Sequence, residues 1–106
     1  MQDKIEILKG FLAEDPNDSF SRFALALELV KLEKFDEAIK AFRTIETNDE
    51  KYVATYYHLG KALESVRKKD EAVETYEKGI KIAEELKDHH SKAELQDALM
   101  NATMDF

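Results

Sequence analysis

The 106-residue chain contains no cysteine, which excludes disulfides, thiol catalysis and cysteine-based zinc sites. Its three glycines, Gly10, Gly60 and Gly79, stand apart from one another, so the sequence lacks a glycine-rich phosphate loop. No apolar run approaches the roughly 20 residues that span a bilayer. The first residues also lack the basic and then apolar pattern of a signal peptide. These absences predict a cytoplasmic protein that neither enters a membrane nor carries a cofactor.

Positive charge is also scarce, because 16 basic residues face 23 acidic ones and the formal net charge is −7. An acidic chain gains little from releasing counterions on a phosphate backbone, so we expect no nucleic-acid partner. The compact basic run Arg67-Lys68-Lys69 is followed directly by Asp70 and Glu71. We therefore interpret this run as a solvated turn rather than a phosphate site.

Histidines, which could bind a metal or act as a base, are few and poorly placed. His89 and His90 are adjacent, so on a helix their side chains point about 100° apart and cannot easily share one ion. Asp88 beside them does not supply the three or four convergent ligands of a transition-metal site. The carboxylates lie mostly on polar helix faces. The sequence therefore predicts no metal site and no enzymatic activity.

What the chain does contain is an internal repeat. Hydrophobic residues make up 43% and charged residues 37%, a balance typical of a globular, helix-rich domain. Sliding the chain by 34 residues aligns its apolar positions and predicts two units, 19–52 and 53–86. The aligned pairs are Leu25 and Leu59, Ala26 and Gly60, Leu29 and Leu63, Ala38 and Ala72, and Phe42 and Tyr76.

Each unit is predicted to form two antiparallel helices. Leu25, Leu29 and Leu32 follow the helical period in the first helix, and Asp18 is placed to cap it. The second helix is expected to start near Asp36, again a capping residue type. Breaks near residues 33–34, 48–49 and 68–69 are short, which forces neighbouring helices to run antiparallel. The small residues of each unit should lie where its two helices touch.

Both ends of the chain are predicted to be capping helices of one domain, which brings the expected total to six. Residues 1–15 form a half repeat, a helix from Gln2 to Glu14 that Pro16 stops. Its inward residues are expected to be Ile5, Leu8, Phe11 and Leu12. Within residues 89–104, Ser91 to about Thr103 is expected to form the C-terminal cap, because a repeat array would otherwise leave its last apolar face in water.

This all-α pattern resembles the tetratricopeptide repeat, over roughly Lys4 to Glu84. The stretch from Tyr56 to Leu63 is especially similar to the family pattern. Three departures stand out: Arg22 replaces a large aromatic residue, Ile45 replaces a small residue, and neither unit ends in the usual proline.

The resemblance implies a protein-binding adaptor or scaffold in which the first helix of each unit lines a concave groove. The partner-binding residues that it implies are Phe20, Phe23, Leu27, Val30, Lys31, Tyr57, His58 and Lys61, with Glu64 and Ser65 beside them. Family members that hold the C-terminal carboxylate of heat-shock chaperones use a lysine and asparagines there. Phe23 and Leu27 occupy the corresponding first-unit sites, so we expect no binding of chaperone tails.

The helix over residues 20–32 is apolar nearly all round, although packing within its unit needs one face. Three interpretations remain open for the surplus apolar side. It could bind an apolar peptide or helix of an unknown partner protein. It could form a twofold homodimer interface. Finally, the chain's own terminal helices could cover it, with Met100, Met104 and Phe106 as lids.

Overall fold

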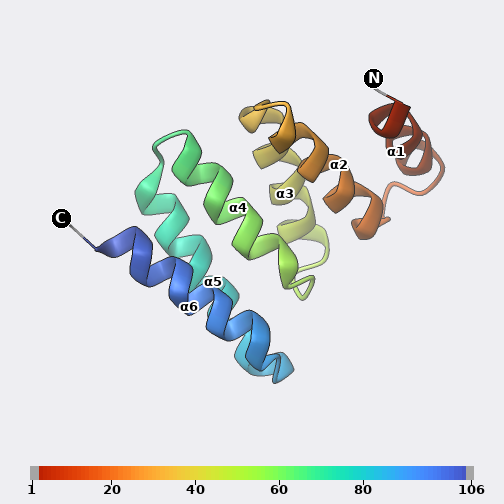
Figure 1. Cartoon of the computed structure of the whole chain (residues 1–106). Coiled ribbons are helices and arrows are strands. Elements are labelled where there is room, and N and C mark those ends of the chain that lie inside the picture. The colour runs from red at the N-terminus through yellow and green to blue at the C-terminus, as the bar shows by residue number, and fades with distance from the viewer. Residues whose placement is uncertain (1–2, 105–106) are drawn as a thin grey trace.

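The computed structural model describes residues 3–104, and within that range the chain forms six α-helices and no strand (Figure 1). The predicted all-α helical repeat is confirmed. Gln2 and Phe106, which the sequence predictions include, lie outside the described residues. The helices are α1 (Asp3–Glu14), α2 (Ser19–Lys31), α3 (Phe35–Asn48), α4 (Ala54–Ser65), α5 (Lys69–Leu86) and α6 (His89–Thr103).

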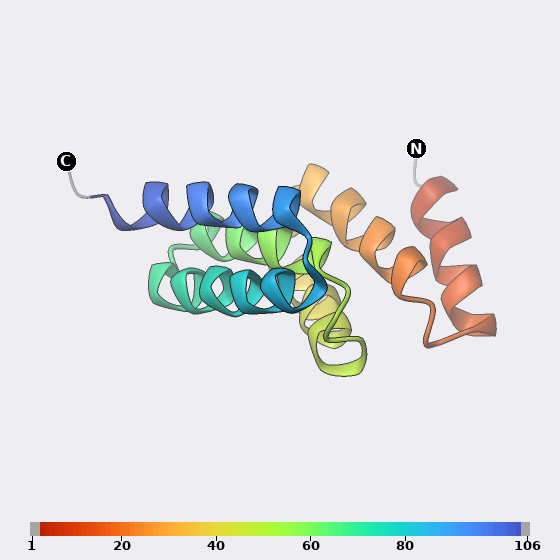
Figure 2. The same cartoon turned by 90° about the horizontal axis from the view of Figure 1, so that it is seen from below.

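The helices form two layers, which Figure 2 shows edge-on. Helices α2, α4 and α6 share one layer, and α3 and α5 form the other. Each helix packs on the helices before and after it, and α6 also contacts α4. Helix α6 therefore takes the place of a third unit's first helix, and α1 takes the place of a preceding unit's second helix.

Two matching caps begin α2 and α6. The Asp18 carboxylate accepts hydrogen bonds from the Ser21 amide at 3.1 Å and the Ser21 hydroxyl at 2.6 Å. Asp88 accepts the same pair from Ser91, at 3.0 and 2.7 Å. These hydrogen bonds hold the pKa values of Asp18 and Asp88 below their usual range. The Asp18 cap was predicted, whereas α6 begins at His89 and not at the expected Ser91, because Asp88 supplies its cap.

Helix α3 corrects the other predicted cap. It begins at Phe35 with Lys34 at the N-cap position and no side-chain cap. Asp36 lies inside the first turn instead, beside Glu37, where a negative charge is favourable near the exposed amides of a helix N-terminus.

Three turns share a left-handed residue within two positions of the end of a helix. Glu33, Arg67 and Lys87 have φ angles of 58°, 63° and 58°. In each turn the next amide donates back to a carbonyl five residues earlier, at 2.9 Å in all three cases. This closure satisfies the last helix carbonyls and reverses the chain within a few residues. It accounts for the reversal of the chain between α2 and α3, between α4 and α5, and between α5 and α6.

Small residues bring the helices of each unit together, as predicted. Ala26, Ala38 and Ala72 are fully buried. A Cβ on Gly60 would overlap the Tyr76 ring, and one on Gly79 would come within 2.5 Å of the Tyr56 Cβ. The two tyrosine rings occupy the space that the glycines leave, so α4 and α5 approach more closely than larger residues at these two positions would allow.

One inward-facing prediction for α1 is wrong. Ile5 is buried and Leu8 and Leu12 are partly buried, but Phe11 is half exposed, as is Ile7 one turn before it. Helix α1 packs on α2. No other helix within residues 3–104 contacts α1, so the side turned away from α2 stays open.

Candidate functional site

Helix α2 presents its surplus apolar side chains to different degrees. Phe20 is 71% exposed, whereas Leu27 and Val30 are partly buried against the core. Lys31 is exposed and pairs with Glu28 at 3.1 Å. Of the aromatic and aliphatic residues that the sequence placed at a binding surface, Phe20 is therefore the most accessible.

Phe23 belongs to an aromatic cluster where α2, α3 and α4 meet. Its ring centroid lies 6.0 Å from that of Phe42, 5.5 Å from that of Tyr52 and 5.3 Å from that of His58. The cluster packs the two repeats against each other, so Phe23 and His58 form the floor of the surface rather than free side chains. Sequence reasoning missed Tyr52, because it lies in a turn outside the helical periodicity.

His58 is largely removed from water in this cluster. Burial lowers the pKa of His58, and the negative charge of Glu94 on α6 opposes that shift without cancelling it. The imidazole is therefore favoured in its neutral form, packed edge-on to Tyr57 at 5.3 Å. No nucleophile in the described part of the chain hydrogen-bonds to it.

Helix α4 continues the surface with polar side chains. Tyr57 is partly buried, and the Lys61 ammonium nitrogen lies 5.7 Å from the centre of its ring. Glu64 accepts a hydrogen bond from the Tyr76 hydroxyl, so this carboxylate holds a ring of the core in place. Ser65 is exposed, and its hydroxyl donates to the Lys61 carbonyl at 3.1 Å.

Helix α6 does not act as a lid over α2. It packs on α5 and α4 and makes no close approach to α2 within the described chain. Met100 and Met104 are 55% and 44% exposed, so the interpretation that they cover the apolar side of α2 is wrong. Helix α1 lies against the Leu25 and Leu29 side instead, and it too leaves Phe20 open.

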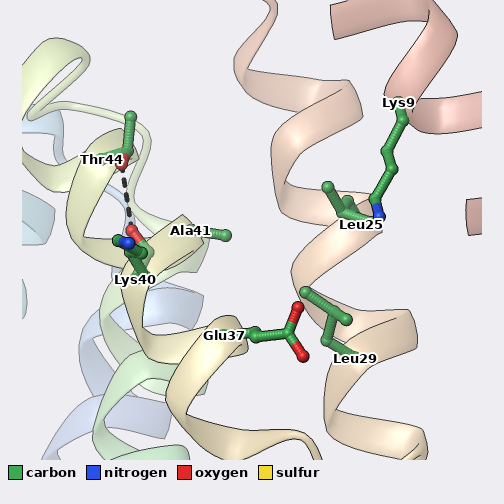
Figure 3. Close-up of a pocket in the computed structure, with 7 residues that line it drawn as sticks. All are labelled: Lys9, Leu25, Leu29, Glu37, Lys40, Ala41 and Thr44. Carbon is green, nitrogen blue, oxygen red and sulfur yellow. Dashed lines mark hydrogen bonds between the residues drawn. The ribbon is translucent and has the colours of Figure 1, made fainter.

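A shallow pocket of about 330 Å³ lies between α1, α2 and α3 (Figure 3). Leu25 and Leu29 form its floor, and the Lys9 and Glu37 side chains reach over them without forming an ion pair. Lys40, Ala41 and Thr44 complete the lining. Thr44 is the one hydroxyl residue of this lining, and it donates to the Lys40 carbonyl at 3.0 Å.

Between residues 3 and 104, no group of three or more histidine, aspartate or glutamate side chains converges as metal ligands would. No helix in the same range has the length and apolar character needed to cross a membrane.

Comparisons with known proteins agree with the repeat pattern. The family model of the tetratricopeptide repeat matches residues 21–52 and 53–86. A tetratricopeptide repeat domain protein from Salinibacter ruber, solved by NMR, is 42% identical, with a TM-score of 0.80 over 84% of this chain and 90% of that chain. Protein BPP2914 from Bordetella parapertussis is 28% identical, with a TM-score of 0.82 over 96% and 89%.

A third solved structure shares the fold alone. The TPR2B domain of yeast Sti1, solved as a pHsp70 complex, is 22% identical, with a TM-score of 0.88 over 93% of this chain and 79% of that chain. No curated protein sequence matches the chain.

Tetratricopeptide repeat domains generally mediate protein–protein interactions and are generally non-catalytic. The family model covers well over half of the chain, and the Salinibacter protein exceeds 40% identity across most of it. The chain therefore belongs to the tetratricopeptide repeat family.

Proposed function

We propose that this protein is a non-catalytic adaptor or scaffold of the cytoplasm that binds a peptide or a partner helix across α2, α4 and α6. The observation that carries the proposal is the exposure of Phe20, which is 71% accessible at the end of an apolar row with Leu27 and Val30. Leaving an aromatic ring in water forgoes the burial that stabilises such side chains. An exposed apolar patch of this kind is typical of an interaction site.

The remaining groove residues have distinct proposed roles. Phe23 and His58 form a preorganised aromatic floor, because each already packs within the cluster. Tyr57 offers a flat surface and a hydroxyl, and Lys61 offers a positive charge to an acidic group of the partner. A binding surface whose floor is rigid before the partner arrives loses less conformational entropy on binding.

The fold similarity to the Sti1 domain supports a peptide partner, since that domain was solved as a pHsp70 complex. We do not propose the same ligand for this chain. Phe23 and Leu27 would present hydrocarbon where a carboxylate-binding groove needs hydrogen-bond donors.

A homodimer is the second candidate, favoured by the same exposed Phe20. Two complete repeats are also few for a stable stack, since about three are commonly needed. In a twofold interface the α2 row of one copy would bury that of the other.

Light scattering on a sizing column, across a concentration series, separates the two candidates. A mass near 12.2 kDa throughout supports a surface left free for a partner. A mass near twice that value, which falls on dilution and in a Phe20→Glu variant, supports the dimer. Ala54→Glu is the matched control, because Ala54 is exposed at the same position of the second repeat.

Selection of randomised peptides against the full chain tests binding itself. Peptides that bind at the proposed surface should lose affinity for Phe20→Glu and keep it for Ala54→Glu, while circular dichroism shows unchanged helicity in both. Retention of the selected peptides by Phe20→Glu would contradict the proposal. Phe23 is a poor probe, because a charge there would disrupt the cluster with Phe42 and Tyr52.

A further inference from the structure

The proposed binding surface changes its chemistry along its length. Each residue of α4 corresponds to the residue 34 positions earlier in α2. Each residue of α6 corresponds to the residue 36 positions earlier in α4, as the buried pairs Leu59 and Leu95, and Ala62 and Ala98, indicate. Leu27 of α2 therefore corresponds to Lys61 of α4 and Asp97 of α6. In the neighbouring row, Ala24 corresponds to His58 and Glu94.

The carboxylates of α6 lie on the binding side. Leu95, Ala98 and Ala102 are buried, and Lys92 reaches Glu84 on α5 at 3.1 Å. At about 100° per residue, Glu94 and Asp97 then lie on the side of α6 away from Lys92. Helix α6 packs on α4, and the negative charge of Glu94 acts on His58 of that helix. The α2 end of the surface is thus apolar and the α6 end is acidic.

These two carboxylates are unneutralised within the described residues. Neither Glu94 nor Asp97 forms an ion pair there, and Asp97 accepts one long hydrogen bond of 3.4 Å from Asn101. The two lysines of the proposed binding surface have other partners. Lys31 pairs with Glu28, and the Lys61 ammonium lies over the Tyr57 ring. The α6 end therefore keeps a negative potential that a partner could complement.

We propose that the occupant is a peptide or helix with apolar side chains at the end over α2 and lysine or arginine at the end over α6. This inference rests on the proposed function and adds the polarity of the partner. Its apolar side chains would pack on Phe20, Leu27 and Val30, where a charged group would lose its hydration without compensation. Its cations would face Glu94 and Asp97, where opposite charge guides encounter and fixes orientation.

The test again uses peptides selected against the full chain, with their charge as the first readout. We expect enriched peptides to combine large apolar residues with lysine or arginine towards one end. The double variant Glu94→Gln/Asp97→Asn should weaken their binding roughly three- to tenfold, the range expected when two exposed ion pairs are lost. The loss should shrink at high salt, because exposed pairs are screened.

A matched control removes the same charge from the other layer. Glu77 and Glu85 of α5 are exposed, so Glu77→Gln/Glu85→Gln changes the net charge from −7 to −5, as the α6 double variant does. Binding to this control should stay unchanged, which would separate a local effect of α6 from the overall acidity of the chain.

The outcomes distinguish this inference from the proposed function. Enriched peptides that are neutral or acidic, or that bind the α6 double variant as well as the parent chain, would overturn the polarity. If such peptides still lose affinity for Phe20→Glu, the proposed function stands. Peptides that ignore Phe20→Glu, or a selection that enriches nothing, would contradict both.

Discussion

The two repeats share a backbone plan but fill their interiors differently. In the second repeat, the Tyr56 ring occupies the space beside Gly79. The corresponding residues of the first repeat are Arg22 and Ile45. Ile45 is almost completely buried, whereas Arg22 turns out to the preceding loop and donates to the Pro16 carbonyl at 2.7 Å. The first repeat thus places its large buried residue, Ile45, on the second helix of the unit, whereas the second repeat places Tyr56 on the first helix.

A second exchange occurs one turn further along. In the second repeat the Tyr76 ring lies against Gly60, and its hydroxyl donates to Glu64. The first repeat has Phe42, Ala26 and Val30 at these positions. Removing the hydroxyl allows an apolar partner in place of the glutamate. This difference explains part of the apolar side of α2. Val30 occupies the position that corresponds to Glu64, and Phe42 has no hydroxyl that would require a carboxylate there.

The junctions between repeats differ as well. Arg43 of α3 pairs with Glu71 of α5 at 2.9 Å, and Lys78 pairs with Glu46 at 3.4 Å. One period earlier, Lys9 and Glu37 stand opposite each other across the open pocket of Figure 3 without pairing. The fold therefore requires that the space between two helices be filled, but it allows different residues on either helix to fill it.

The largest expected effect comes from removing the substitute side chain of the first repeat. Ile45→Gly should lower the free energy of unfolding by about 4 kcal/mol, because it leaves a cavity and places glycine inside a helix. Adding Arg22→Tyr should recover about 1–2 kcal/mol, since the new ring can occupy the vacated space as Tyr56 does. Urea denaturation followed by circular dichroism measures both changes. If Arg22→Tyr changes the free energy of unfolding equally with and without Ile45→Gly, the two positions do not substitute for each other in filling this space.

A methyl group at Gly60 should destabilise the second repeat. Gly60→Ala is expected to cost about 2 kcal/mol, although alanine favours helix by about 1 kcal/mol, because its Cβ would overlap the Tyr76 ring. The hydrogen bond to Glu64 holds that ring in place, so adding Tyr76→Phe should relieve part of the cost. The measurement is the same denaturation series. A more stable Gly60→Ala variant would show that the ring moves aside freely.

The turns should respond alike in both repeats. Glu33 and Arg67 adopt left-handed conformations that strain a residue with a Cβ. Glu33→Gly and Arg67→Gly are each expected to raise the free energy of unfolding by about 0.5–1 kcal/mol. Lys34→Gly serves as the control, because its φ of −89° gives glycine no advantage. Unequal increases in the free energy of unfolding would show that the two turns are not equivalent.

The smallest expected effect is a dependence on pH that the second repeat alone can show, because Ala24 replaces His58 in the first. Burial lowers the pKa of folded His58, so the unfolded chain takes up the proton first, near the usual value of 6.5. The free energy of unfolding should therefore fall as the pH drops below about 6.5. Glu94→Gln should enlarge this fall, since Glu94 favours the protonated form. Denaturation midpoints between about pH 7 and pH 5, compared with His58→Gln, give the contribution of this one residue. A slope that His58→Gln leaves unchanged would assign the effect to other groups.

Most of the fold could be predicted because a 34-residue period and a helical period are visible together in one sequence. The cap at Asp18 followed from residue type and position. The turn residues Glu33 and Arg67 could not be recognised, since neither is the glycine or asparagine that usually marks a left-handed position.

The candidate surface was harder to predict. Periodicity shows which side of a helix is apolar, but the neighbouring helices decide whether that side is covered. Phe11 was expected to face inward and lies open, because α2 is the one helix among the described residues that contacts α1. Phe23 looked like a free anchor, but an aromatic cluster that includes Tyr52 holds it. The acidic side of α6 was not predicted, because corresponding residues of α4 and α6 are 36 positions apart and the 34-residue period does not align them.

Because each helix packs chiefly on the helix before it and the helix after it, the chain forms its interfaces between segments that are close in sequence. Little entropy is then lost in closing long loops, and chains of this kind fold quickly for their size. During synthesis from the N-terminus, the apolar end of the surface on α2 would thus leave the ribosome before the acidic end on α6.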